Sequence, residues 1–142
     1  MGYRSDVVLG IAFPNTAALI SFVSAQRINS KYPDVMEVLK DYVVTNADGY
    51  SSHVVLWARY ADVKWNAVYN IIKINDDILA CAKDAEYSTI YIEVGEEYND
   101  TKLEVSHGDK SDGGCLYDMF GIIREVRTPN DSIALKDVKH EP

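Results

Sequence analysis

The chain has 142 residues, of which 47% are hydrophobic and 11% aromatic, so we expect one folded domain with a substantial core. Its formal net charge of −8 would repel a polyanion, and we therefore expect no direct nucleic-acid binding. Two cysteines, Cys81 and Cys115, are too few for a disulfide framework, and no apolar stretch is long enough to cross a membrane. We expect a cytoplasmic protein with reduced thiols and no membrane partner.

The first predicted element is a strand over Val7–Phe13, which is apolar on both faces and should be buried on both. Because charged residues precede this short run, we expect no signal peptide. Pro14 ends the strand, and Asn15 offers an N-cap for a helix over Thr16–Arg27. Its candidate buried residues are Leu19, Phe22, Val23 and Gln26.

Pro33 suits the first turn of a second helical piece. The candidate buried residues of this piece are Val35, Val38, Leu39 and Tyr42. Residues Tyr42–Thr45 fit either a short strand or the end of the helix. The Asp48-Gly49 pair is a turn signal, and it predicts a hairpin that leads into a strand over Ser51–Tyr60.

The clearest strand signal of the chain lies in Val54–Tyr60, which is rich in β-branched and aromatic residues. Both faces of this segment are largely apolar, so it predicts a central strand in which Trp57 is mostly buried. One face carries Val54, Leu56, Ala58 and Tyr60, and the other carries Val55, Trp57 and Arg59.

Trp65 stands between this strand and a second long helix, and we expect it to close the end of the sheet with its indole N–H near the helix start. Asp62 or Asn66 is the expected cap of the helix. The candidate buried residues of the helix are Val68, Ile71, Ile72, Asn75, Leu79 and Ala82.

Alternating apolar residues predict a fourth strand over Ile90–Val94, a short strand around Leu103 and Val105, and a longer strand over Leu116–Val126. The predicted order is strand, helix, strand, strand, helix, strand, followed by a C-terminal strand extension. This order indicates an α+β fold with a ferredoxin-like β-α-β-β-α-β core, in which two helices cover one antiparallel sheet.

Residues 1–127 are expected to form a single α+β domain, and residues 128–142 a partly flexible tail with one docked stretch at Ile133–Leu135. The loop His107–Gly114 is polar and glycine-rich, so we expect it to be mobile.

No residue pattern in the chain indicates catalysis or metal binding. The three histidines, His53, His107 and His140, are far apart and lack a second ligand at metal spacing. Cys115 has no assignable base, as a nucleophile would need. We expect no catalytic residue, no metal and no cofactor, and an enzyme without a recognisable motif ranks last among the functional hypotheses.

The most unusual feature is an acidic segment, residues 93–112, which holds seven acids and two lysines for a net charge of −5. Concentrated charge of this kind attracts a basic partner and accelerates association. The alternative is a solvated edge that prevents strands of different molecules from pairing. The candidate partner-binding residues are Glu93, Glu96, Glu97, Tyr98, Asp100 and Trp65.

Three separated segments occur together in one group of proteins: Gly2–Val7 (GYRSDV), Asp62–Trp65 (DVKW) and Glu93–Asp100 (EVGEEYND). On these segments the chain resembles small, largely uncharacterised proteins of tailed phages and prophages. Asn66 departs from the pattern, since an aromatic residue is common there. The resemblance spans about the first 100 residues and implies a phage origin and an intracellular setting in the host, without implying catalytic residues.

Two functional hypotheses follow. In the first, the protein binds and inhibits or redirects a host protein with a basic surface, such as a nucleic-acid-targeting defence enzyme. In the second, it binds a small molecule or nucleotide signal, with Trp57, Trp65 and neighbouring tyrosines stacking on a base. A homodimer is left open in both cases.

Overall fold

The computed structural model describes residues 5–47, 49, 52–63, 69–95, 101–120 and 132–138. Within these residues, six strands form one antiparallel sheet in the order β5-β4-β1-β3-β2-β6. The strands are β1 (Ser5–Phe13), β2 (Val43–Asn46), β3 (Val54–Val63), β4 (Thr89–Gly95), β5 (Thr101–Ser106) and β6 (Ile133–Ala134).

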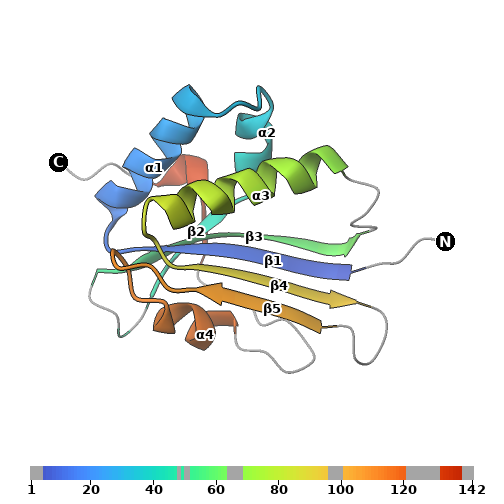
Figure 1. Cartoon of the computed structure of the whole chain (residues 1–142). Coiled ribbons are helices and arrows are strands. Elements are labelled where there is room, and N and C mark those ends of the chain that lie inside the picture. Colours follow the sequence, from blue (N-terminus) through green and yellow to red (C-terminus); the bar gives the residue numbers. More distant parts are fainter. Residues whose placement is uncertain are drawn as a thin grey trace.

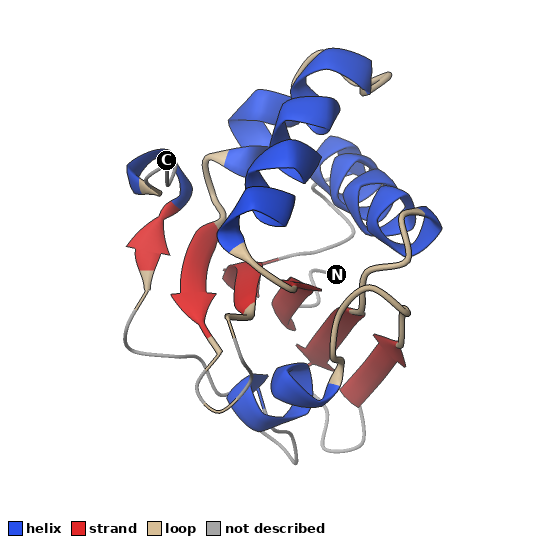
Figure 2. Ribbon diagram, turned by 90° about the vertical axis from the view of Figure 1, so that its left-hand side faces the viewer, coloured by secondary structure: helices blue, strands red, loops and turns tan. Residues whose placement is uncertain are grey.

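The helices lie on both faces of this sheet (Figure 1). Three of them, α1 (Thr16–Asn29), α2 (Val35–Leu39) and α3 (Tyr69–Asp84), cover one face, and α4 (Gly114–Phe120) covers the other. Figure 2 shows the same layers along the strands, with the sheet between the two helical layers. A short 3₁₀ helix, Leu135–Asp137, follows β6.

The central strand β1 is buried on both faces, as its sequence predicted. Val7, Leu9, Ile11 and Phe13 pack with the residues of α1, α2 and α3, whereas Val8 and Ala12 pack with α4. On the α4 face, Gly10 permits close packing, because an added Cβ would lie 3.1 Å from the Ile90 side chain and 3.4 Å from the Phe120 ring.

The strands predicted over Val7–Phe13 and Val54–Tyr60 correspond to β1 and β3, and these two strands pair with each other. β1 and β3 are antiparallel, with Phe13 opposite Val54 and Val7 opposite Tyr60. Residues Tyr42–Thr45 were compatible with a short strand or with the end of the helix. The structure shows a strand from Val43, since β2 pairs with β3 and places Val43 opposite Trp57. Trp57 itself is buried, as expected, with 7% of its surface exposed.

The first two helices also follow their predictions closely. Asn15 caps α1, and its Oδ1 accepts a 2.8 Å hydrogen bond from the backbone N–H of Ala18. All four residues predicted to be buried in α1 are buried, and so are the four that belong to α2 and the residues after it. Helix α1 extends two residues beyond the predicted end at Arg27.

The α+β class and the antiparallel sheet are confirmed, but the complete strand order differs from that of a plain ferredoxin-like domain. β5 is added beside β4 and β6 beside β2, which widens the sheet at both edges. The docked stretch predicted at Ile133–Leu135 is present, because Val44 pairs with Ile133 and the Leu135 N–H donates to the Tyr42 carbonyl.

The prediction of a strand over Leu116–Val126 was wrong, because residues 114–120 form α4 and residues 121–126 lie outside the described part. Leu116 and Phe120 are four residues apart, so a helix places both on one face, where they are fully buried against the sheet. The Asp112 carboxylate accepts a 2.8 Å hydrogen bond from the Gly114 N–H at the helix start. Asp62, a proposed cap of α3, instead lies within β3, and Asn66 is outside the described residues.

The loop predicted to be mobile, His107–Gly114, is tied to the end of α3 and the start of β4. Ser88 is buried, and its hydroxyl contacts the Gly108 N–H and the Ser111 carbonyl at 2.9 Å each. The Lys110 N–H donates to the Glu86 carbonyl at 2.9 Å. Gly108 permits this approach, since an added Cβ would lie 2.1 Å from the Glu86 carbonyl oxygen. Glycine at position 108 therefore lets the loop hydrogen-bond closely to Glu86 and Ser88, rather than making it mobile.

Candidate functional site

A groove of about 530 Å³ lies between α3 and the strands β4 and β5. Helix α3 contributes side chains at positions 72, 76, 79 and 83, which share one side of a helix. Alternate residues of β4 face the same groove, while Ile90 and Ile92 point to the α4 face. The charged and hydrogen-bonding residues of the groove are Asp76, Lys83, Thr89, Tyr91, Glu93, Lys102, Glu104 and Ser106.

The side chains on the strand side of the groove contact one another. The Tyr91 hydroxyl donates a 2.6 Å hydrogen bond to Oε1 of Glu93. The Lys102 ammonium lies 3.4 Å from Oε1 of Glu104 and 5.6 Å from the centre of the Tyr91 ring. These contacts orient two carboxylates and one ammonium group along the groove wall.

Asp76 is the acid that α3 contributes. Partial burial raises the pKa of its carboxyl above the usual value, Lys102 and Lys83 oppose this shift, and Glu104 adds to it. Three carboxylates and two ammonium groups line the groove, so the two lysines do not balance the full negative charge of the acids. A further cation placed here would stabilise the charged form of Asp76.

Of the six residues predicted to bind a partner, the structure places Glu93, in the groove just described. Trp65, Glu96, Glu97, Tyr98 and Asp100 lie outside the described residues, so their predicted roles, including the closing of the sheet end by Trp65, stay predictions. Asp76, Lys83, Tyr91, Lys102 and Glu104 were not among the predicted site residues. The signal that could have found them is periodicity: a 3.6-residue period on α3 and alternation on β4 and β5.

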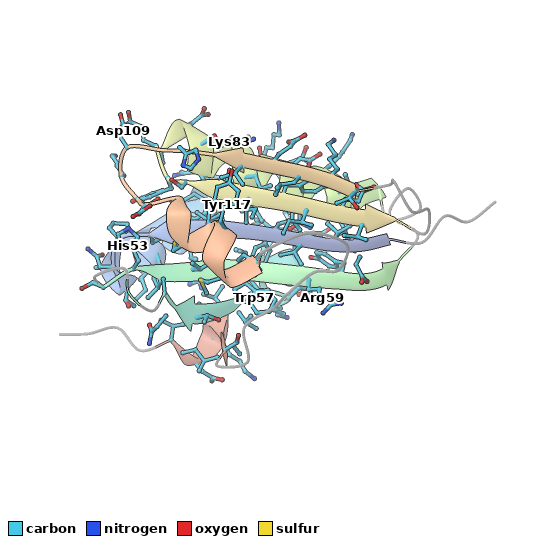
Figure 3. All side chains as sticks on the ribbon, turned by 90° about the horizontal axis from the view of Figure 1, so that it is seen from below. His53, Trp57, Arg59, Lys83, Asp109 and Tyr117 are labelled. Atoms are coloured by element: carbon cyan, nitrogen blue, oxygen red, sulfur yellow. The ribbon has the colours of Figure 1, made fainter. Side chains whose placement is uncertain are left out.

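A second groove, of about 550 Å³, lies where α1 begins and β3 starts. Its lining holds no Asp, Glu, Lys or Arg and mixes apolar residues with polar ones, which include Asn15, Asn46 and His53. The Nε2 atom of His53 accepts a 3.0 Å hydrogen bond from the Asp112 N–H, so this histidine holds the His107–Gly114 loop. Figure 3 shows His53 and Arg59 toward opposite ends of β3.

The remaining candidates for chemistry occupy packed positions. Cys115 is a buried thiol outside any disulfide, with its Sγ 3.1 Å from the Asp112 carbonyl oxygen, and Cys81 is a half-buried thiol. Within the described ranges, no three His, Cys, Asp or Glu residues are grouped so that they could hold a metal ion. In the same ranges, no helix has the length and apolar character needed to span a membrane.

A chain of polar contacts, buried at Tyr42 and Asn75, connects α3 to the residue before β2 and to β3. The Tyr42 hydroxyl donates to Oδ1 of Asn75, whose Nδ2 donates to the Tyr60 hydroxyl at 3.3 Å and to the Ile71 carbonyl at 2.9 Å. Tyr60 in turn donates to Asp41 at 3.0 Å. Burial raises the pKa of Tyr42 well above its usual value, and nearby Tyr60, Asp41 and Asp76 add to the shift.

No protein-family model matches the chain, and no curated protein or solved structure matches it either.

Proposed function

We propose that the protein binds a partner protein with a basic surface. The contact surface is the groove between α3 and β5 together with Glu96, Glu97 and Asp100, the acids that follow β4 in the sequence. The observation that carries the proposal is the position of Glu93, a predicted partner-binding residue, beside Asp76 and Glu104 in one groove. One acid from each of α3, β4 and β5 thus faces the same space.

The electrostatics of the groove support a cationic guest. A partly buried carboxylate with a raised pKa gains more from an incoming cation than a fully solvated one does. A lysine or arginine side chain can enter a groove of this size, and arginine can pair with two carboxylate oxygens at once. Nucleic acid would instead meet a chain with a net charge of −8.

The biological setting we propose follows from the resemblance to tailed-phage and prophage proteins. The protein acts in the host cytoplasm, where it inhibits or redirects a host protein. Enzymes of defence systems that act on nucleic acids are fitting targets, because they present basic channels that an acidic surface can occupy.

The test is affinity capture of the tagged full chain from a bacterial lysate, with mass spectrometry of the bound proteins. The groove variant D76N/E93Q/E104Q should lose the partner, whereas E37Q, which changes an exposed acid on α2, should retain it. Recovery of the same partner with the groove variant would contradict the proposed site.

A second candidate function is the binding of a small molecule in the same groove, whose volume falls within the range of ligand pockets. Stacking of a base on Trp57 is not part of this candidate, because that indole is buried against Phe120 and bonded to Thr45. Native mass spectrometry of the purified protein distinguishes the two candidates, since only the second leaves a non-protein mass on the chain.

For the fold, we propose that β1 to β4 with α1 and α3 form a ferredoxin-like core to which β5, β6 and α4 are additions. The inner strand order β4-β1-β3-β2 supports this proposal.

A further inference from the structure

β5 forms one edge of the sheet, and no other strand in the described part of the chain pairs with its outer side. The strand has six residues, and the first four are exposed. By contrast, the strand at the opposite edge, β6, has two residues. The outer side of an edge strand presents backbone N–H and C=O groups that can pair with a further strand.

The two faces of β5 have different chemistry. Lys102 and Glu104 face α3, with their charged groups 3.4 Å apart, and Leu103 is on the opposite face. Leu103 is 42% exposed, and Tyr117 on α4 is 46% exposed on the same side of the sheet. Figure 3 shows that side, with Tyr117 on α4 in front of the strands.

This strand is complementary to a second copy of itself. In an antiparallel pair, directly opposite residues lie on the same face of the sheet. If Leu103 faces Leu103 of a second copy, then Lys102 faces Glu104 of the second copy, and Glu104 faces its Lys102. Thr101 then faces Val105. Opposite charges and apolar pairs are the favourable cross-strand pairs.

The adjacent registers are unfavourable by the same reasoning. Centring the pair on Lys102 places two lysines opposite each other, and centring it on Glu104 places two glutamates opposite each other. Like charges directly opposite are destabilising. The sequence of β5 therefore selects one register.

We propose that two copies of this protein associate through their β5 strands, antiparallel and centred on Leu103, to form one continuous sheet across a two-fold axis. The occupant of the edge is thus a second copy of the chain. Since the contact consists of one six-residue strand from each copy, and each copy carries a net charge of −8, the dimer is reversible and depends on concentration.

The first test is sedimentation velocity over a concentration series, with circular dichroism to show that each variant is folded. The parent should dimerise, and K102E and E104K should each be monomeric, because each places like charges opposite one another. An equimolar mixture of the two variants should dimerise again, since one chain now presents two acids and the other two lysines. K40E and E37K make the same charge changes on the exposed Lys40–Glu37 pair of α2 and should dimerise like the parent.

The second test reports the register by disulfide formation in a C81S background. Residues directly opposite have Cα atoms about 4.5–5.5 Å apart, which a disulfide can bridge. The L103C variant should therefore form a disulfide between two copies under mild oxidation. The T101C variant should not, because residue 101 lies opposite residue 105 of the second copy, several residues away from position 101 of that copy.

Three outcomes would overturn the proposal. The parent could remain monomeric up to about 1 mM, a range that covers weak association. K102E and E104K could each dimerise as the parent does, which would place the contact elsewhere. The two variants could also fail to dimerise when mixed.

Discussion

The indole Nε1 of Trp57 donates a 3.0 Å hydrogen bond to the hydroxyl oxygen of Thr45. That oxygen also lies 2.8 Å from the Ser132 hydroxyl, immediately before β6. The Trp57 ring packs edge-on against Phe120 of α4, with the ring centres 5.5 Å apart. The Trp57 side chain thus joins β3 to β2, to helix α4 and, through Thr45, to the C-terminal segment.

Trp57→Ala should lower the free energy of unfolding by about 3–5 kcal/mol, because it removes a buried aromatic side chain and leaves a cavity. The measurement is urea unfolding followed by circular dichroism. Arg59→Ala is the control, since Arg59 lies two residues further along β3 with a partly exposed ion pair to Asp6 at 3.2 Å. The control should change stability by less than about 1 kcal/mol. A Trp57→Ala variant that unfolds like the parent would contradict the core assignment.

Tyr42→Phe should destabilise the protein by about 1–3 kcal/mol at pH 7, because Oδ1 of the buried Asn75 loses its donor. The pKa of Tyr42 is raised in the folded state, so the folded chain keeps this proton at a pH where the unfolded chain, with a tyrosine pKa of about 10, has lost it. The stability that Tyr42 contributes is therefore complete below about pH 10 and is lost as the pH rises above it.

Unfolding free energies of the parent and Tyr42→Phe at pH 7 and pH 11 test this prediction. The gap between the two proteins should narrow at pH 11. Tyr117→Phe changes an exposed tyrosine and should be neutral at both values. An equal gap at the two pH values would show that ionisation of Tyr42 does not oppose folding.

Asp76→Asn should raise stability slightly at pH 7. Burial raises the pKa of Asp76 in the folded state, so folding binds this proton more tightly, and stability falls as the pH rises from about 4 through the folded value. The gain should stay below about 1 kcal/mol, because solvent screens a largely exposed group. It should disappear near pH 3, where both states are protonated. Thermal unfolding at the two pH values measures the effect, and Asp109→Asn, an exposed loop variant, should give no comparable change.

Most of the core could be predicted from the sequence, because β1 and β3 are apolar on both faces and few other arrangements bury such strands. The same pattern does not specify the register between the two strands, which the structure sets with Phe13 opposite Val54. Helix α4 could not be predicted in this way, since the short run containing Leu116 and Phe120 fits both a strand and a helix. The neighbouring sheet decides between them, because the helix packs the Phe120 ring over Gly10 and buries Leu116 in the same cluster.

The residues of the groove could not be predicted as one site, because they come together only in the folded chain. Glu93 belongs to a run of acids that is visible in the sequence, but Asp76 comes to it only through the packing of α3 on the sheet. The loop His107–Gly114 shows that a glycine-rich composition does not by itself predict mobility. The glycines of His107–Gly114 suggest mobility, whereas Gly108 is needed for a backbone contact with Glu86 that fixes the loop.

The acids on and after β4 should act mainly on the rate of binding to the captured partner. Replacement of Glu93, Glu96, Glu97 and Asp100 by Gln or Asn should slow association more than it accelerates dissociation, because charges at an interface act mainly by steering the encounter. Folding should be nearly unaffected, since exposed charges contribute little to stability. The measurement is association kinetics by surface plasmon resonance at low and high salt.

Raising the salt should slow association of the parent steeply, because screening shortens the range of surface charges to about 8 Å at physiological ionic strength. The neutralised variant should show a much weaker salt dependence, and Glu37→Gln should behave like the parent, since Glu37 lies on α2 away from the groove. If the parent binds equally fast at all salt concentrations and the neutralised variant matches it, the acids serve only to keep the protein soluble. The contact surface would then have to be sought among the tyrosines and tryptophans, and replacement of the exposed Tyr117 by Ala would be the next measurement.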